Sequence, residues 1–466
     1  MFWSQLCSGT CKRRSLYAVS LLIILCLVLA GCTSEPPASK GKVKVMFWDE
    51  EQFFREYGNL FNTLYPDIEI EVADTDSLSR GAGIDPNTAL DEYIEREQPD
   101  VLVLDKVQYK HLALDNRLLD LEHILQVEEF HAEDLLPSAL RLLRNMGGGT
   151  LKGLSPIFSG SAIYYNKDLF DKHQISPPSG KLTWRELLEL ALRFPADGQG
   201  ADRTFGFEWG SSDPFDLGLV IGIRQGLDFA DHSREKLVMN SPRWREILSI
   251  TTEAFKSGAI HTPEHLEKQE LADSNLARNP FVTGKIAMAL AGPELGYSLG
   301  QAKQLISGYT SFNWGMIAEP IDPQNPDYGS ITLRGIYAVR EDSQNRDAAV
   351  KLVEFINSDQ MAKASSRTDS WNLQTRTKYN KNSDGVSYEP FYALDIQEQP
   401  FYISMPPTFS GPFMKLASSE LRKVVNGEQD IEEAIREIQL KGQEELDKAH
   451  LVERMAEDSP DDGQDT

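Results

Sequence analysis

The chain has 466 residues, with 71 acidic and 47 basic side chains and a formal net charge of -24 at pH 7. This negative charge argues against any general affinity for nucleic acid or other polyanions. Hydrophobic residues make up 41% and charged residues 25% of the sequence, which is ordinary for a globular protein. The length allows about two or three compact units.

The N-terminus has the layout of a secretory signal. A basic cluster at residues 12–14 precedes the apolar run Leu21–Ala30, which is short for a membrane-spanning helix. The run ends in Leu29-Ala30-Gly31-Cys32, which resembles the bacterial lipobox. We therefore predict a lipoprotein signal peptide over residues 1–31 and lipidation of Cys32, which would hold the body at the outer face of the cytoplasmic membrane. The alternative is an uncleaved N-terminal anchor.

The positions of the cysteines limit the chemistry of the mature chain. All four, Cys7, Cys11, Cys26 and Cys32, lie in this N-terminal segment. Cleavage before Cys32 would leave 466 - 31 = 435 residues, whose only cysteine is lipidated. No disulfide within the chain, cysteine nucleophile or thiolate metal site would then be possible.

The pattern after a polar tether at residues 32–42 predicts β-α-β-α-β. Alternating apolar residues from Val43 to Phe47 and again from residue 68 to 72 predict strands, and a helical pattern separates them. A second helix around residues 89–97 leads to the uniformly apolar Val101–Leu104, as a buried parallel strand requires. Ligands bind beyond the carboxyl ends of such strands. This points to Trp48, Asp49, Asp74 and Asp105.

Further along, the chain is mostly helical. Thr183 and Glu186 form a capping-box pattern before an apolar stripe, and the stripe from Ile431 to Ile438 has the same spacing. We interpret these stripes as core. The last residues, 451–466, are strongly acidic, and we expect them to form a disordered tail.

Several strings in order resemble the family 1 extracellular solute-binding proteins, the receptors of ABC importers that include maltose-binding protein. They are Tyr65-Pro66-Asp67-Ile68, Pro99-Asp100-Val101, Lys152-Gly153-Leu154-Ser155-Pro156, Tyr164-Tyr165-Asn166-Lys167-Asp168-Leu169-Phe170, Leu182-Thr183-Trp184-Arg185-Glu186-Leu187, Phe281-Val282-Thr283-Gly284-Lys285-Ile286-Ala287-Met288, and Gly427 with the helix that follows it. The resemblance covers nearly all of the mature chain.

This resemblance implies an α/β fold of two lobes that close on a ligand by a hinge. We expect residues 43–155 and 318–355 in the N-terminal lobe, and residues 156–317 and 356–450 in the C-terminal lobe. The implied function is delivery of a carbohydrate-like solute to an ABC permease by a monomeric, lipid-anchored receptor without catalysis or cofactor. A pocket for sugars needs aromatic faces beside carboxylates, amides and arginines.

Candidate ligand-binding residues follow from the resemblance and from their loops. Trp48, Asp49 and Asp105 follow the first and third strands, and Trp209 lies beside Glu208 at a position where the family often supplies an aromatic. For Trp48 and Trp209 the alternative is a tryptophan packed in the core.

A second group of candidates comes from the later part of the chain. Trp371, Asn372 and Arg376 lie in a polar loop, where a tryptophan is hard to explain as core. Glu294 replaces the tryptophan of a "G-x-W" pattern, which could favour a more polar or cationic ligand, although Glu294 could also be exposed and without function.

Other chemistries have weaker signals. Residues 197–202 resemble part of a calcium-binding loop but lack the glutamate at position 12 of an EF-hand loop. Gly147-Gly148-Gly149 lacks the lysine that follows the glycines of a phosphate-binding loop. Neither H-E-x-x-H nor G-x-S-x-G occurs, so we predict no metal and no catalytic residues. Two alternatives stay open: a ligand-sensing partner of a membrane kinase, and a secreted hydrolase.

Overall fold

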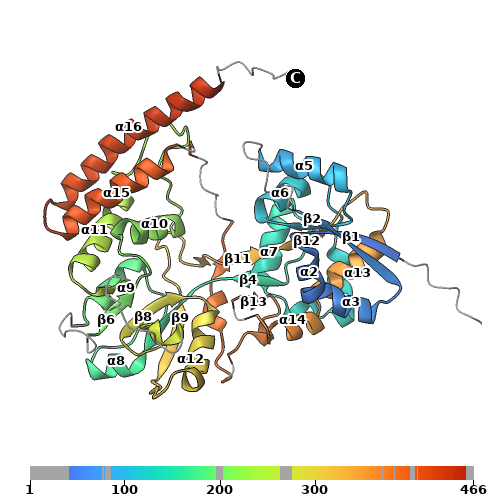
Figure 1. Ribbon diagram of the computed structural model, residues 1–466, viewed down its shortest axis with the longest axis horizontal. Coiled ribbons are helices and arrows are strands. Elements are labelled where there is room, and N and C mark those ends of the chain that lie inside the picture. Colours follow the sequence, from blue (N-terminus) through green and yellow to red (C-terminus); the bar gives the residue numbers. More distant parts are fainter. Residues whose placement is uncertain are drawn as a thin grey trace, which may run out of the picture.

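The computed structural model describes residues 41–75, 78, 85–195, 203–262, 275–369, 371–382, 384–398, 405–406 and 408–457. These residues form two α/β lobes that lie side by side and are joined by short strands between them (Figure 1). The signal segment, Cys32, most of the tether, the 197–202 loop and residues 458–466 lie outside the described residues.

The N-terminal lobe is built on a four-stranded sheet of order β12-β3-β1-β2. Its strands are β1 (Gly41–Phe47), β2 (Ile68–Asp74), β3 (Val101–Leu104) and β12 (Ile336–Val339). Its helices are α2 (Glu50–Phe53), the π-helical turn η1 (Phe54–Gly58), α3 (Asn59–Leu64), α5 (Pro86–Glu97), α6 (Lys106–Leu114), η2 (Glu122–Gln126), η3 (Glu128–Phe130), η4 (Ala132–Asp134), α7 (Pro137–Met146), α13 (Arg346–Ile356) and α14 (Asp359–Ser365).

The three predicted strands of this lobe are confirmed, and β1 is parallel to both β2 and β3. One correction is needed, because the sheet is mixed: β12 comes from much later in the chain and runs antiparallel to β3, with Tyr337 opposite Val103. All residues of β3 and β12 are buried, so periodicity could not reveal the direction of either strand.

The C-terminal lobe contains a five-stranded sheet of order β7-β6-β8-β5-β9. Its strands are β5 (Ala162–Asn166), β6 (Phe205–Glu208), β7 (Ile260–His261), β8 (Ile286–Ala291) and β9 (Trp314–Ala318). Its helices are α8 (Lys167–Lys172), α9 (Trp184–Ala191), α10 (Pro214–Arg224), α11 (Pro242–Lys256), η7 (Asn275–Arg278), α12 (Pro293–Leu305), α15 (Ser410–Val425) and α16 (Ile431–Glu457).

Local signals explain where several of these helices begin. Thr183 and Glu186 make the predicted capping box of α9, whose residues Trp184, Leu187 and Leu188 are buried.

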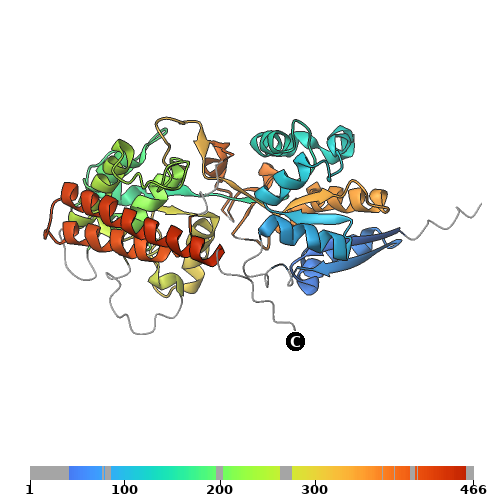
Figure 2. The same cartoon turned by 90° about the horizontal axis from the view of Figure 1, so that it is seen from above.

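The helices α15 and α16 lie antiparallel along one face of this lobe (Figure 2). Helix α16 continues to Glu457, so residues 451–457, which we expected in the disordered tail, are helical.

Short strands join the lobes. A three-stranded sheet of order β11-β4-β13 lies between them (Figure 1), and β10 and β14 form a separate two-stranded sheet. The connecting elements are β4 (Ile157–Ser159), β10 (Tyr328–Gly329), β11 (Thr332–Arg334), β13 (Leu373–Gln374), η8 (Thr377–Tyr379), η9 (Glu389–Tyr392) and β14 (Asp395–Ile396). Helix α14 precedes the last crossing, contacts α13, and packs its Met361 in a core cluster that contains residues of both lobes, among them Phe47 and Tyr164.

Candidate functional site

The carboxyl ends of β1 and β3 meet at one edge of the N-terminal sheet. These strands are parallel neighbours, with Val45 opposite Val101, while the chain passes from β1 first to β2 on its other side. In open α/β sheets, ligands bind beyond the carboxyl ends of the strands at such a reversal of strand order. Trp48, Asp49 and Asp105 follow β1 and β3 directly and therefore lie at this edge.

The two aspartates at the edge cap helices. The Asp49 carboxylate accepts a hydrogen bond from the backbone N–H of Gln52 at 2.6 Å, at the start of α2. Asp105 forms a capping box with Gln108 at the start of α6, with a backbone N–H to carboxylate distance of 2.9 Å. Each carboxylate is exposed, and each satisfies a helix amide that would otherwise lack a partner.

Trp48 presents an aromatic surface at the same edge. Its side chain is 46% exposed, and its ring stacks on the buried Phe47 with centroids 3.9 Å apart. The contact with Phe47 holds one part of the indole against the core and leaves the rest open to solvent. Trp48 is therefore not packed between strand and helix as a core residue.

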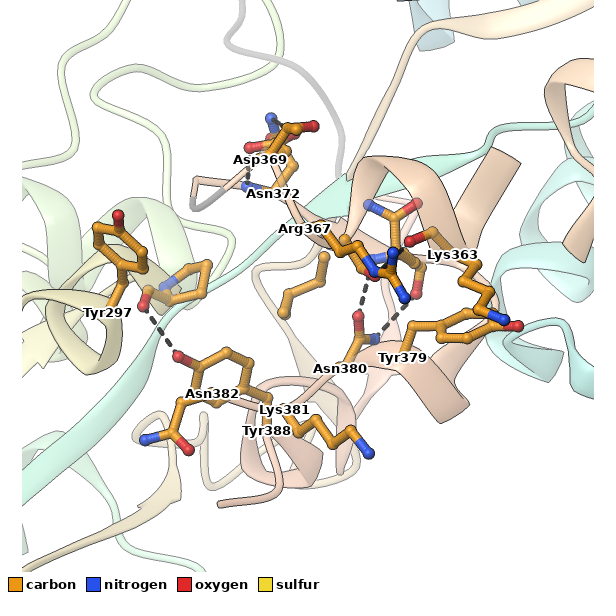
Figure 3. Close-up of a pocket in the computed structure, with 15 residues that line it drawn as sticks. Tyr297, Lys363, Arg367, Asp369, Asn372, Tyr379, Asn380, Lys381, Asn382 and Tyr388 are labelled. Carbon is orange, nitrogen blue, oxygen red and sulfur yellow. Dashed lines mark hydrogen bonds between the residues drawn. The ribbon is translucent and has the colours of Figure 1, made fainter. Parts of the chain in front are cut away.

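A cavity of about 550 Å³ lies between the lobes, beside the crossing strand β13. Its walls come from the start of α12, from the end of α14 and from the loops on either side of η8: Pro293, Tyr297, Lys363, Ser366, Arg367, Thr368, Asp369, Asn372, Leu373, Gln374, Tyr379, Asn380, Lys381, Asn382 and Tyr388. Tyr297 lies on one side, and Lys363 and Tyr379 lie on the opposite side (Figure 3). Both lobes thus contribute to one polar cavity.

Amide side chains hold the wall near β13. Asn380 accepts a hydrogen bond from the backbone N–H of Gln374 at 2.8 Å and donates one to its carbonyl at 2.9 Å (Figure 3). Asn380 and Gln374 are both buried. This reciprocal pair fixes the strand and the loop as one unit, so the wall is in place before any ligand arrives.

Two tyrosines fix the first turn of α12 at the other wall. Tyr388 donates to the Pro293 carbonyl at 3.2 Å, and Tyr164 donates to the Gly292 carbonyl at 3.0 Å. Burial raises the pKa of Tyr388 to about 12 and that of Tyr164 well above its usual value, so both hydroxyls stay donors. A Cβ at Gly296 would lie 2.6 Å from the Tyr388 hydroxyl, which is why this position has no side chain.

One protein-family model matches the sequence of this chain. The model of the bacterial extracellular solute-binding proteins covers residues 48–363, more than half of the chain. The chain belongs to this family. The predicted resemblance and the two-lobed fold are confirmed.

Individual relatives are more distant. An arabinooligosaccharide-binding protein of Bacillus subtilis is 27% identical over 37% of this chain and 40% of its own length. The sn-glycerol-3-phosphate-binding periplasmic protein UgpB of Escherichia coli is 22% identical over 56% of this chain and 57% of its own length. This solute-binding protein thus spans about half the length of the curated relatives it matches, or less.

The solved structures agree on the fold. The sugar-binding protein MalE of Xanthomonas citri is 18% identical, with a TM-score of 0.57, and the match covers 89% of this chain and 99% of that one. At this identity the likeness shows the architecture and leaves the ligand open.

Asn372 is the predicted site residue that lines the interlobe cavity of this solute-binding protein. Its backbone N–H and that of Trp371 donate to one oxygen of Asp369. Its side-chain amide donates to the other oxygen at 2.9 Å, and Figure 3 shows Asn372 beside Asp369. Trp371 lies in the same turn, directly before Asn372, and its side chain is 68% exposed. The turn that places Asp369 and Asn372 at the cavity therefore leaves the indole of Trp371 largely exposed to solvent.

Glu294 lies in the first turn of α12, next to a cavity residue, but does not line the cavity. One of its carboxylate oxygens accepts from the backbone N–H of Gly292 at 3.0 Å. The Glu294 side chain is partly buried, so the expected alternative of an exposed side chain does not apply, and this burial raises the pKa of Glu294.

Arg376 does not line the cavity. It is 1% exposed, and its guanidinium donates to the carbonyls of Asn357 at 2.8 Å, His131 at 2.9 Å and Phe130. The same group lies over the Phe130 ring, 4.7 Å from its centroid. These contacts join η3 to the end of α13, so Arg376 has a structural position instead of the ligand-binding one expected from its loop.

Trp209 lies at the end of β6 in the C-terminal lobe. Its indole is partly buried against the core of that lobe, and its Nε1 atom is buried without an acceptor in the described part of the chain. The neighbouring Glu208 is largely buried, and desolvation raises its pKa to about 7. The structure therefore places Trp209 closer to core than to open cleft.

The cavity residues that sequence reasoning missed come from three separate segments. Tyr297 lies in α12. Lys363 lies in α14, and Arg367 lies in the turn after that helix. The amide residues Gln374, Asn380 and Asn382 lie in β13 and in the loop that follows it. One signal was available: residues 372–382 contain Asn372, Gln374, Asn380 and Asn382, an unusual density of amides.

Among the described ranges, no group of three or more His, Cys, Asp or Glu side chains is placed to hold a metal ion. None of the helices in those ranges is both long and apolar enough to cross a membrane.

Proposed function

We propose that this protein is the lipid-anchored receptor of an ABC importer, which captures a carbohydrate-like solute outside the cytoplasm and hands it to permease subunits unchanged. The observation that carries the proposal is the interlobe cavity. It has the volume of a small-ligand site, and both lobes line it with hydroxyl and amide groups suited to a sugar.

The two lobes supply the mechanism. They are joined by the short strands β4, β11 and β13, so a change of dihedral angles in these connections can bring α12 toward α14. A ligand that contacts Tyr297 on one side and Asn372 on the other binds the closed state better than the open state. Ligand therefore shifts the population toward the closed form, the form that a permease can distinguish from the empty receptor.

Exposed aromatic rings support a saccharide ligand. Trp371 and Trp48 present indole faces to solvent near the cavity loop and the sheet edge, and such faces stack on the C–H surface of a sugar ring. We propose that Trp371, Trp48 and Asn372 contact ligand, with Asp49 and Asp105 at the sheet edge and Glu294 beside the cavity. The arabinooligosaccharide-binding relative is consistent with this class.

Anchoring is the second part of the proposal. Leu29-Ala30-Gly31-Cys32 after an apolar run supports cleavage before Cys32 and attachment of diacylglycerol there. A single acyl chain binds membranes only marginally, whereas two or more hold stably. The short tether before β1 then keeps the monomeric receptor beside its permease.

A thermal-shift screen of mono- and oligosaccharides tests the receptor function. A ligand at a hundredfold excess over Kd stabilises the folded state by about 2.7 kcal/mol. We expect at least one saccharide to raise the melting temperature. A screen in which only amino acids, peptides or polyamines stabilise the protein would refute the carbohydrate class and keep the receptor fold.

Metabolic lipid labelling tests the anchor separately. The wild-type chain should carry label and fractionate with membranes, and Cys32→Ala should lose both. Absence of label on the wild-type protein would refute lipidation without affecting the solute-binding function.

A further inference from the structure

We infer that the interlobe cavity selects a sugar that bears a negatively charged group, a carboxylate or a phosphate. The inference rests on the proposed function as a saccharide receptor and adds a ligand class to it. It comes from the charges and hydrogen-bond donors around the cavity.

Three cationic side chains line the cavity: Lys363, Arg367 and Lys381. All are exposed, and within the described part of the chain none of them forms an ion pair or hydrogen bond through its charged group. In a protein of net charge -24, carboxylates are abundant, and many lysines and arginines elsewhere pair with them, such as Arg144 with Glu122 and Lys378 with Asp134. Here three positive charges line one cavity with a single negative charge, that of Asp369.

The cavity contains one acidic residue, Asp369, and its carboxylate is already used. Both of its oxygens accept hydrogen bonds within its own turn, from the backbone of Trp371 and from the backbone and side chain of Asn372. Asp369 therefore stabilises its loop. The balance of charge at the cavity wall is positive.

Buried amide donors strengthen the case. Gln374 is 1% and Asn382 is 9% exposed, and the side-chain nitrogen of each has no acceptor in the described residues. The Asn382 oxygen accepts from the backbone N–H groups of Asp384 at 3.0 Å and Val386 at 2.8 Å, which fixes the amide so that its nitrogen remains a donor. An unpaired buried donor is costly, and an acceptor-rich group entering the cavity can relieve that cost after a small side-chain movement.

Lobe closure turns this arrangement into selectivity. In the open cavity, water solvates the three cations. Closure on a neutral sugar would remove part of that water and leave the positive charges without a partner, which is unfavourable. A carboxylate or phosphate supplies the missing charge and can accept two hydrogen bonds from Arg367.

Titration calorimetry on the full-length protein in detergent tests the inference with matched ligands. The probes are di- and trigalacturonate with their methyl esters, and glucose 6-phosphate with glucose. We expect one acidic probe to bind at least tenfold more tightly than its neutral counterpart, and the ratio to shrink as salt screens the charges. The pair that shows the difference distinguishes carboxylate from phosphate.

Two other outcomes would overturn the inference. If a neutral probe binds as tightly as its acidic partner, the charge preference is refuted while the saccharide receptor stands. If no acidic probe binds but neutral saccharides stabilise the protein in the thermal-shift screen, the charge preference is also refuted and the saccharide receptor stands. Failure of every saccharide, neutral or acidic, refutes the proposed function itself.

Matched variants locate the effect. The triple variant Lys363→Gln, Arg367→Gln, Lys381→Gln should weaken binding of the acidic probe at least tenfold. The control is Lys172→Gln, Lys256→Gln, Lys415→Gln, which changes the net charge equally at exposed positions outside the cavity. Equal effects of the two triples, or no effect of the first, would refute a local site.

Asn382→Asp provides a second, nearly isosteric test. Aspartate retains the oxygen that accepts from Asp384 and Val386, so the loop is preserved, while the donor becomes an acceptor and adds a negative charge. Affinity for the acidic probe should fall at least tenfold, and affinity for its neutral counterpart should fall less. Unchanged affinity for the acidic probe would contradict a ligand-facing role of Asn382.

Discussion

Arg224 and Glu319 form a largely buried ion pair where the C-terminal lobe meets the crossing strands. Ser161 lies between them, with its hydroxyl 3.1 Å from the carboxylate and from both terminal nitrogens of Arg224. The Ser330 hydroxyl donates to the same carboxylate at 2.6 Å. Ser161 precedes β5, Glu319 follows β9 and Ser330 precedes β11. This network therefore joins two strands of the C-terminal lobe to the start of the connecting strand β11.

Glu319→Gln should lower the free energy of unfolding by about 3–5 kcal/mol, because it leaves a partly buried guanidinium without its counter-charge. Urea denaturation measures the loss. The control is Asp327→Asn, which breaks the exposed pair with Lys181 nearby and should cost less than about 1 kcal/mol. A similar small loss for both variants would show that the Arg224 pair does not brace the connection.

Arg376 and Arg367 lie nine positions apart in the chain and should respond in opposite ways. Arg376→Ala removes a buried guanidinium from three carbonyls, so it should destabilise the unliganded protein by about 3 kcal/mol or more. Arg367→Gln changes an exposed side chain at the cavity. It should leave the thermal unfolding temperature nearly unchanged and weaken the binding of the acidic ligand. Thermal unfolding beside calorimetry checks both. Weaker binding without lost stability in Arg376→Ala would return that residue to the binding site.

The sequence predicted the parts of the fold that depend on local pattern. The strands from Val43 and Val101 and the capping box at Thr183 required only periodicity and nearest neighbours. Strand β12 could not be placed, because its partner β3 lies more than 200 residues earlier and both strands are uniformly apolar.

The candidate site was predicted only in outline for the same reason. Asn372 and Trp371 were found because they lie in a conspicuous polar loop, but Tyr297 and Lys363 join them only when two lobes and three segments come together. Arg376 lies in the same loop and is buried, because Phe130 and the end of α13 cover it. No property of residues 371–376 alone distinguishes these outcomes.

Glu208 should make the stability of the protein depend on pH. Its carboxyl titrates near 4.5 in the unfolded chain and at about 7 in the folded protein, so the folded state binds more protons between these values. Stability therefore falls as pH rises from about 4.5 to 7. Glu208→Gln removes this dependence and should stabilise the protein at pH 8 by on the order of 3–4 kcal/mol, at about 1.4 kcal/mol per pKa unit, with little effect at pH 4.

Unfolding of the wild type and Glu208→Gln across pH 4–8 checks this prediction. Glu253→Gln, on the exposed side of α11, controls for the loss of one negative charge. A stability difference between wild type and Glu208→Gln that does not change with pH would contradict burial of the Glu208 carboxyl.

Alanine substitutions of Trp371 and Trp209 distinguish a ligand-binding tryptophan from a core tryptophan by their effects on affinity and stability. Trp371 is 68% exposed, so Trp371→Ala should change the stability of the unliganded protein by less than about 1 kcal/mol. If its ring stacks on a sugar, the same substitution should weaken binding by more than about 1.4 kcal/mol, tenfold in Kd. Trp209 packs against the core of the C-terminal lobe, so Trp209→Ala should cost about 3 kcal/mol of stability whether or not ligand is present. Calorimetry with the saccharide that the screen supplies, beside unfolding of the unliganded variants, measures both quantities. Retained affinity in Trp371→Ala would remove that residue from the site, and a stable Trp209→Ala with weakened binding would add Trp209 to it.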